Sequence, residues 1–345
     1  MSKGSNPFES GSSTTKASKV RRSCRGRQRI RLLFVFLLIL HIAFIPAARA
    51  AGSLKVVTTV APLTNIVKNV GGNRIDLHGV IPEGTDSHTF EPAPSDIKFL
   101  SQADLLIFNG LNLETPTETL AKANRKKGAK VLKLGDNTVS KKEWVFDFSF
   151  PESDGNPNPH LWLSVAHAIR YAELVRDALI SLDPAGKPYY DQRTTDYLAR
   201  LKKLDEAVLK TMETIPPQNR KLLTYHDSWA YFCPRYGCKV VGAIQPSSFS
   251  EPSPREMARL IDQLKAEKVP AIFGSEVFPS KILDQIGKEA GVKYVSTLRD
   301  DDLPGAAEAP EHTYIGMMVE DVKTMATVLG GKGEALTGID PKNLP

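Results

Sequence analysis

Short β-branched runs alternate with longer segments of helical periodicity along most of this chain. Leu54–Thr59 and Ile75–Ile81 predict strands, and Pro62–Val70 between them predicts a helix. Further strands are predicted at Leu105–Phe108 and Lys130–Leu134. Because strands alternate with helices, the pattern predicts an α/β fold in which a parallel sheet is covered on both faces.

The longest helical segment is Lys187–Thr214, which at 1.5 Å per residue would extend for roughly 40 Å. A coiled coil is the alternative, but polar threonines would interrupt its seam, which would last barely three heptads. After a Pro-Pro pair the alternation starts again, with strands predicted at Lys221–Tyr225 and Lys293–Leu298 and a helix at Ser228–Tyr236. The second half thus repeats the first, so the sequence predicts two similar α/β lobes with one helix between them.

The first fifty residues differ in composition from the rest of the chain. They hold ten Lys and Arg against one acid, Glu9, and an uncharged apolar run, Leu32–Ile45, that is too short to span a bilayer as a helix. The run is followed by Ala48-Arg49-Ala50, the small-x-small pattern that signal peptidase cleaves. We expect residues 1–50 to be a signal peptide that is cleaved after Ala50; a retained membrane anchor is the alternative.

Removal of this segment reverses the sign of the net charge. Ten bases against one acid give the segment +9, so the remaining chain carries −3 of the total +6. The basic isoelectric point therefore belongs to the targeting segment, and we predict no nucleic-acid partner. A soluble periplasmic protein is the simplest expectation.

Two cysteines, Cys233 and Cys238, remain after the predicted cleavage and flank Pro-Arg-Tyr-Gly. An oxidising compartment favours a disulfide between them, because Pro and Gly turn the chain back on itself. The competing interpretation is a zinc site, but two thiols at this spacing without a second pair are not typical of one.

The chemistry gathers around Ile81–Asp96, where three prolines preset an extended, polar loop with His88 in its middle. A lone histidine there would be an ordinary surface residue. A second histidine, His160, follows Asn-Pro in another proline-containing loop, and a third, His226, comes directly after an apolar run. Three histidines in preset positions, in a chain with only seven, predict one metal site.

Four motifs carry a family resemblance, and they occur in the order G-T-D-S-H-T-F-E-P-A-P-S-D, N-P-H-L-W-L-S, Y-H-D-S-W-A-Y-F, and T-L-R-D-D-D-L-P-G with T-Y-I-G-M-M. They resemble the metal-ligand motifs of the zinc- and manganese-binding solute receptors of ABC transporters, and the similarity extends from about Leu54 to Leu329. The resemblance implies that the long helix joins the two lobes. The sequence departs from the family pattern at two points. No cysteine for a lipid anchor stands at the predicted cleavage site. Residues 135–159 lack the histidine-rich loop of many zinc-specific relatives, which argues against strict specificity for zinc.

The resemblance implies a metal site formed by His88, His160, His226 and Asp301, with one Zn²⁺ or Mn²⁺ per chain as the transported ligand. Asp301 is chosen from three consecutive aspartates by counting from Thr297-Leu298 as relatives do. Since ligands of open α/β sheets bind beyond the carboxyl ends of strands, we expect the site in the cleft between the lobes. Three imidazoles and a carboxylate suit zinc and also accept manganese or ferrous iron.

The predicted function is metal capture in the periplasm and delivery to the membrane permease of an ABC transporter, by a monomer without catalytic residues. Four protein ligands favour capture over catalysis, which keeps a position open for water, and neither H-E-x-x-H nor G-x-S-x-G occurs. The alternatives are an exported zinc-dependent hydrolase and a protein with a structural metal site. The predicted parts are the signal peptide 1–50, an N-terminal lobe 51–186, a linking helix 187–214 and a C-terminal lobe 215–345.

Overall fold

The computed structural model describes residues 53–245, 252–277 and 281–345, and these belong to one unit that extends from Ser53 to Pro345. The predicted signal peptide and its apolar run lie outside the described residues. Within the described part, no helix is long and apolar enough to cross a bilayer.

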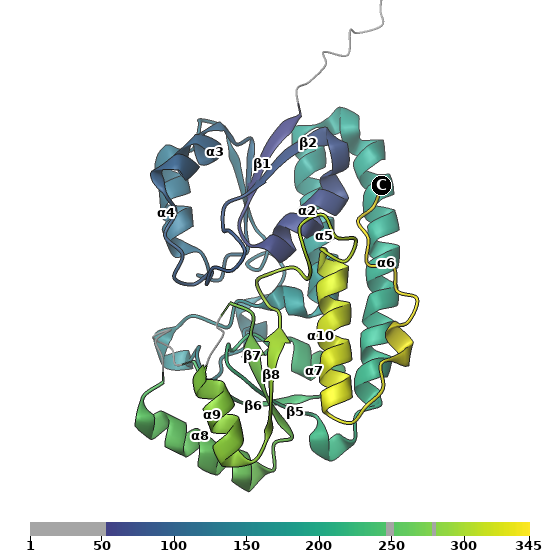
Figure 1. The fold of residues 1–345 in the computed structure, drawn as a ribbon. Helices are drawn as coiled ribbons and strands as arrows, with labels where there is room; N and C mark the ends of the chain where they lie inside the picture. The colour runs from purple at the N-terminus through teal and green to yellow at the C-terminus, as the bar shows by residue number, and fades with distance from the viewer. Residues whose placement is uncertain (1–52, 246–251, 278–280) are drawn as a thin grey trace, which may run out of the picture. The chain divides into compact units, whose positions relative to one another are not determined.

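Eight strands and nine α-helices of the described residues follow the predicted alternation (Figure 1). The strands are β1 (Leu54–Thr58), β2 (Ile75–Gly79), β3 (Leu105–Phe108), β4 (Lys130–Lys133), β5 (Lys221–Thr224), β6 (Lys239–Ala243), β7 (Ala271–Ser275) and β8 (Lys293–Leu298). The helices are α2 (Ala61–Gly71), α3 (Ile97–Gln102), α4 (Thr115–Asn124), α5 (Val165–Leu182), α6 (Lys187–Glu213), α7 (Phe232–Tyr236), α8 (Pro254–Glu267), α9 (Lys281–Ala290) and α10 (Tyr314–Val328).

The strands form two parallel sheets with the same internal order. The first sheet runs β2-β1-β3-β4 and the second β6-β5-β7-β8, and all pairs are parallel. In each sheet the strand that comes first in the chain, β1 or β5, occupies the second position. It pairs with the strand that comes third in that lobe, β3 or β7. The predicted fold class, two similar α/β lobes with parallel sheets, is confirmed.

Neighbouring residues of the inner strands face different cores, as the two-residue period of a strand requires. Val56 joins the large hydrophobic cluster that also contains α2, α5, α6 and α10, whereas Val57 joins the smaller cluster under α3 and α4. In the second sheet, Leu222 joins the large cluster and Leu223 the one under α8 and α9. Each such buried side chain stabilises the fold by about 1.5–3 kcal/mol, and the shared large cluster links the lobes.

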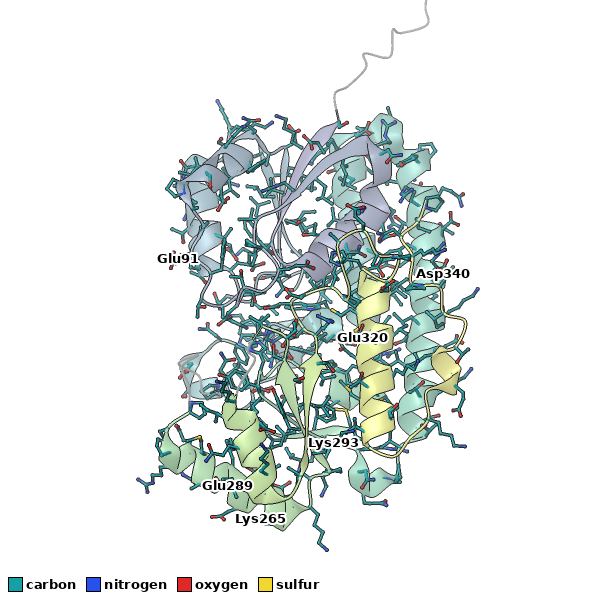
Figure 2. The ribbon with its side chains drawn as sticks, viewed as in Figure 1. Glu91, Lys265, Glu289, Lys293, Glu320 and Asp340 are labelled. Carbon is teal, nitrogen blue, oxygen red and sulfur yellow. A yellow bond between two sulfur atoms is a disulfide. The ribbon has the colours of Figure 1, made fainter. Side chains whose placement is uncertain are left out.

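Helix α6 spans 27 residues and packs against α2, α5, α7 and α10. Its inward stripe includes Tyr190, Tyr197, Leu201 and Val208, all essentially inaccessible to solvent. By contrast, charged side chains in other parts of the chain, such as Lys265 of α8 and Asp340 near the C-terminus, lie on the surface (Figure 2). The long helix between the lobes is confirmed, while the exact lobe boundaries stay a prediction.

One predicted helix is wrong at its beginning, because Ser228–Tyr236 is helical only from Phe232. The preceding backbone is engaged elsewhere: the carbonyl of Asp227 accepts a hydrogen bond of 2.6 Å from Asn158 Nδ2, which lies in the first half of the chain. The helical bond that is present joins the N–H of Cys233 to the carbonyl of Trp229 at 3.1 Å, two residues further along the chain. Tertiary contact therefore overrides the local helical pattern.

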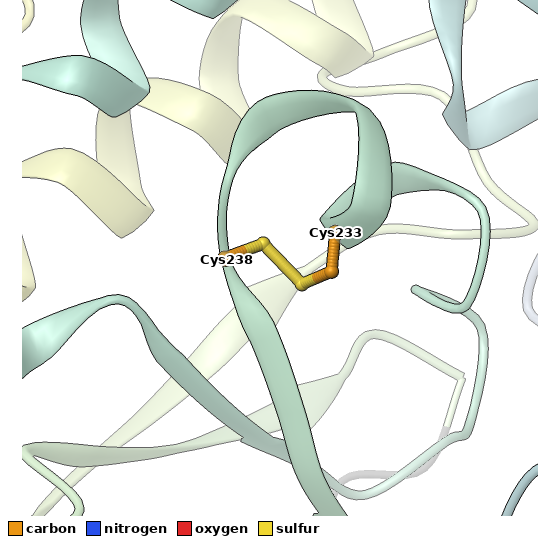
Figure 3. The surroundings of a disulfide bond; sticks show 2 residues. All are labelled: Cys233 and Cys238. Carbon is orange, nitrogen blue, oxygen red and sulfur yellow. A yellow bond between two sulfur atoms is a disulfide. The ribbon is translucent and has the colours of Figure 1, made fainter. Parts of the chain in front are cut away.

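The short helix α7 is followed by a left-handed turn at Gly237 and a disulfide between Cys233 and Cys238 (Figure 3). The two Cα atoms are 4.5 Å apart. The disulfide interpretation of these cysteines is confirmed, so they do not form the competing zinc site. The disulfide ties the first turn of α7 to the residue directly before β6.

Candidate metal centre

Three histidines from distant parts of the sequence meet at the ends of the two sheets. His88 lies in the loop after β2, His226 follows β5 by two residues, and His160 precedes α5. Each offers one ring nitrogen, and these nitrogens all lie within 4.8 Å of one another. The structure therefore brings together the three predicted histidine ligands.

His160 lies at the centre of this cluster. Its Nε2 is 3.2 Å from Nε2 of His88 and 2.9 Å from Nε2 of His226. The rings of His160 and His226 are nearly perpendicular, with centroids 4.8 Å apart. Three nitrogens that converge on one point are the arrangement with which imidazoles hold a transition metal.

Two amide side chains orient these imidazoles, and the sequence analysis missed both. His160 Nδ1 donates to Asn158 Oδ1 at 2.8 Å, and His226 Nδ1 donates to Gln245 Oε1 at 2.6 Å. An amide oxygen is only an acceptor, so each Nδ1 carries the proton and each Nε2 keeps its lone pair for a metal. Asn158 could have been inferred from its place two residues before His160, whereas nothing in the sequence marks Gln245.

Burial sets the protonation of the cluster. Desolvation, together with the charge of His226, holds the pKa of His88 and of His160 well below the usual range. Burial also lowers the pKa of His226, but the carboxylates of Asp300 and Asp301 outweigh it and raise the pKa of His226 above its usual value. Two imidazoles are thus ready to bind a cation, while the neighbouring carboxylates favour the protonated form of His226.

The three consecutive aspartates have different surroundings. Asp300 Oδ2 lies 3.8 Å from His226 Nε2, and Asp301 Oδ2 accepts a long hydrogen bond of 3.4 Å from the backbone N–H of Ser87. Both oxygens of Asp302 accept from the N–H of Gly84, at 2.9 and 2.8 Å. Asp302 is therefore used to connect the loops, while Asp300 and Asp301 are the carboxylates beside the histidines.

Two acids near the site, Asp86 and Asp227, do not contact the histidine rings as the amides do. Asp86 accepts from the backbone N–H of His88 at 2.9 Å and so shapes the loop. Asp227 accepts from the N–H of Ser149 at 2.8 Å, and burial together with the charge of Asp227 raises the pKa of Asp147 to about 9. Asp227 thus joins the loop before His160 to the loop that carries His226.

A pocket of about 120 Å³ borders the cluster on the side of His88. Phe150 and Pro159 form part of its wall, and the polar residues Asn112 and Asn156, joined by a 2.7 Å hydrogen bond, form another part. The pocket reaches His88, while His160 and His226 stay buried.

The geometry agrees with a family model that matches residues 56–328, "Zinc-uptake complex component A periplasmic", or ZnuA. The match covers both sheets and all four sequence motifs. The chain belongs to the ZnuA family. This agrees with the resemblance seen in the sequence.

Relatives of this ZnuA-family chain include named metal receptors. It is 31% identical over 269 residues to "Metal ABC transporter substrate-binding lipoprotein FimA" of Streptococcus parasanguinis, which covers 78% of this chain and 87% of the relative. It is 29% identical over 282 residues to "Manganese ABC transporter substrate-binding lipoprotein PsaA" of Streptococcus pneumoniae, covering 80% and 89%.

Among solved structures, the chain is similar to the periplasmic zinc-binding protein TroA of Treponema pallidum. The TM-score is 0.73 at 28% identity, and the alignment covers 81% of this chain and 99% of TroA. The fold assigned above from strand order and the long helix is therefore that of a known metal receptor.

Proposed function

We propose that this ZnuA-family receptor captures one divalent transition metal with His88, His160, His226 and a neighbouring aspartate and delivers it to an ABC permease. The observation that carries the proposal is the convergence of three imidazole nitrogens within 4.8 Å. Names of the relatives, which are substrate-binding proteins of metal ABC transporters, support delivery to a permease. They favour the receptor over the alternatives of an exported hydrolase and a structural metal site.

Titration of the mature chain with zinc, in competition with a chelator, tests this function. One tightly bound equivalent is expected, with no release of product from ester or phosphoester substrates. Failure to bind zinc, manganese or iron would overturn the proposal. Turnover that depends on the metal would favour the hydrolase.

Zinc is the proposed cargo, with manganese second. Three nitrogen donors favour zinc in the general affinity order of divalent metals, whereas manganese prefers oxygen donors. The relative named for manganese and the absence of a histidine-rich loop in residues 135–159 keep manganese as the second candidate. The cargo in the cell also depends on which metal is available.

The fourth ligand is proposed to come from the Asp300-Asp301 pair. Asp301 stays the prediction from the sequence, but the 3.8 Å approach to His226 Nε2 is made by Asp300. We expect Asp300→Ala to weaken zinc binding most, Asp301→Ala less, and Asp302→Ala least, because Asp302 is bound to Gly84. Chelator competition measures all three; the largest loss in Asp301→Ala would restore the assignment made from the sequence.

Metal affinity should fall as the pH is lowered. Burial and Asp300 raise the pKa of Asp301 to about 7, so Asp301 takes up a proton as the pH falls through neutrality. The carboxylates of Asp300 and Asp301 raise the pKa of His226 above its usual value, so His226 is also protonated more readily. A metal needs the deprotonated forms, so protons compete with it and affinity decreases on the acid side. Zinc dissociation constants between about pH 8 and about pH 5 measure this; affinity that stays flat would argue against these ligands.

Export by a signal peptide cleaved after Ala50, giving a monomer in the periplasm, is also proposed. The Ala-x-Ala pattern and the short apolar run support it, although the relatives described above are named lipoproteins. The denatured mass of the exported protein should place Ala51 at its beginning, and the native mass should be that of one chain. A retained apolar run or an attached lipid would mean membrane anchoring instead.

A further inference from the structure

Glu276 directly follows β7 and reaches across to the loop that carries the three aspartates. Its Oε1 accepts hydrogen bonds from three consecutive backbone N–H groups, those of Asp300 at 3.0 Å, Asp301 at 3.2 Å and Asp302 at 3.0 Å. Successive N–H groups that point to one oxygen form a concave anion-binding turn. The Glu276 carboxylate thus sets the path of this loop.

Ser275, the neighbour of Glu276 in the chain, lies between the carboxyl groups of Glu276 and Asp300 and can donate its one proton to either. The hydroxyl of Ser275 lies 3.2 Å from Glu276 Oε2 and 3.3 Å from Asp300 Oδ1. With Oδ1 directed to this hydroxyl, Asp300 Oδ2 is the oxygen that faces His226 Nε2. The contacts of Glu276 therefore determine the backbone path of the loop, and Ser275 beside it contacts the Asp300 carboxylate.

In the N-terminal lobe, a glutamate near the corresponding strand also accepts hydrogen bonds from successive backbone N–H groups. Glu114 lies beyond the end of β3, which occupies the same place in its sheet as β7, and it accepts from the N–H groups of Asn109 at 2.6 Å and Gly110 at 3.1 Å. Asn109 Nδ2 in turn donates to the carbonyl of Pro159 at 2.9 Å, next to His160. In both lobes a glutamate thus holds a loop at the site, Glu114 the loop after its own strand and Glu276 the loop after the neighbouring strand β8.

We propose that Glu276 is a positioning residue that fixes the direction in which Asp300 and Asp301 present their carboxylates to the metal. This inference rests on the proposed function of the site. Glu276 is the partner of three backbone N–H groups, so its removal frees the loop even though both aspartates remain. Loss of groups that orient metal ligands typically costs 10–100-fold in affinity.

The test uses the mature chain and four variants, with zinc affinity from chelator competition and the visible spectrum of the Co²⁺-loaded protein as readouts. Glu276→Ala should bind zinc at least about tenfold more weakly and alter the Co²⁺ spectrum, because the carboxylate ligand is misplaced. Glu276→Gln keeps an acceptor oxygen and should restore most of both. Glu276→Asp keeps the charge but is one methylene too short, so it should resemble Glu276→Ala.

Asp183→Ala is the matched control for loss of stability. Like Glu276, Asp183 is a carboxylate that accepts several hydrogen bonds. Its donors are Arg74, Tyr190 and the N–H of Gly186 at the junction of α5 and α6. It should lower the melting temperature and leave zinc affinity and the Co²⁺ spectrum unchanged. Wild-type affinity and spectrum in a folded Glu276→Ala or Glu276→Asp would overturn the inference. Absence of metal binding by the wild-type chain would instead refute the proposed function.

Discussion

His160→Ala should weaken zinc binding by a factor of roughly a hundred to a thousand. Zinc sites built by proteins bind with about 10–16 kcal/mol in total, so one of four ligands contributes about 2.5–4 kcal/mol. His160 is the ligand whose loss should cost most, because its Nε2 lies within 3.2 Å of both other histidine nitrogens and it is fully buried. Competition with a chelator of known affinity measures the change.

His167→Ala is the control for this prediction. His167 is partly buried on α5 and contacts the ring of Tyr231 edge-on, with centroids 5.5 Å apart, but it is outside the cluster. We expect it to lower stability without changing zinc affinity. Equal losses in the two variants would mean that binding responds to general destabilisation, and unchanged binding in His160→Ala would place the metal elsewhere.

The fold could be predicted from the sequence because local pattern and tertiary arrangement agree. Strands with apolar residues at every position, such as β3, require cover on both faces, and the order of elements then requires parallel pairing. The helix α6 is long enough for its periodicity to be unambiguous, and it was predicted to within one residue. The failure at α7 has the opposite cause, since the backbone before that helix is held by a contact from Asn158, which is distant in sequence.

The three histidines could be predicted for a different reason. Each lies in a loop whose direction is limited by prolines or by an adjacent strand, so few arrangements are open to it. The aspartates could not be separated in this way, because consecutive side chains in a turn point in different directions that only the structure defines. Their directions depend on Glu276 and Gly84, which are distant in sequence.

Continuity of the large hydrophobic cluster bears on how metal is captured and released. The cluster includes Tyr171 of α5, Leu201 of α6 and Tyr314 at the beginning of α10. The hydroxyl of Tyr314 donates to the carbonyl of Trp162 at 2.7 Å. A wide hinge motion would separate these buried side chains and leave polar groups unpaired. We therefore expect exchange of metal to proceed by rearrangement of the ligand loops rather than by rotation of whole lobes.

His226→Glu should lower the ratio of zinc affinity to manganese affinity by about tenfold or more. A carboxylate is a harder donor than an imidazole, so it favours manganese. The substitution also removes the contact with Gln245 and places a third carboxylate beside Asp300 and Asp301, which a divalent cation must neutralise. Zinc should lose affinity, because it loses a nitrogen ligand, while manganese should lose less or gain.

Titration of both metals at one pH, in competition with a chelator, gives this ratio for the wild type and the variant. His78→Glu is the matched control, because His78 stacks on Phe99 at the edge of the first sheet and is not part of the cluster. It makes the same chemical exchange outside the site, so the ratio should stay that of the wild type. If the ratio also stays unchanged in His226→Glu, then His226 does not bind the metal or the geometry of the site outweighs ligand type. The preference for zinc would then lose its chemical basis.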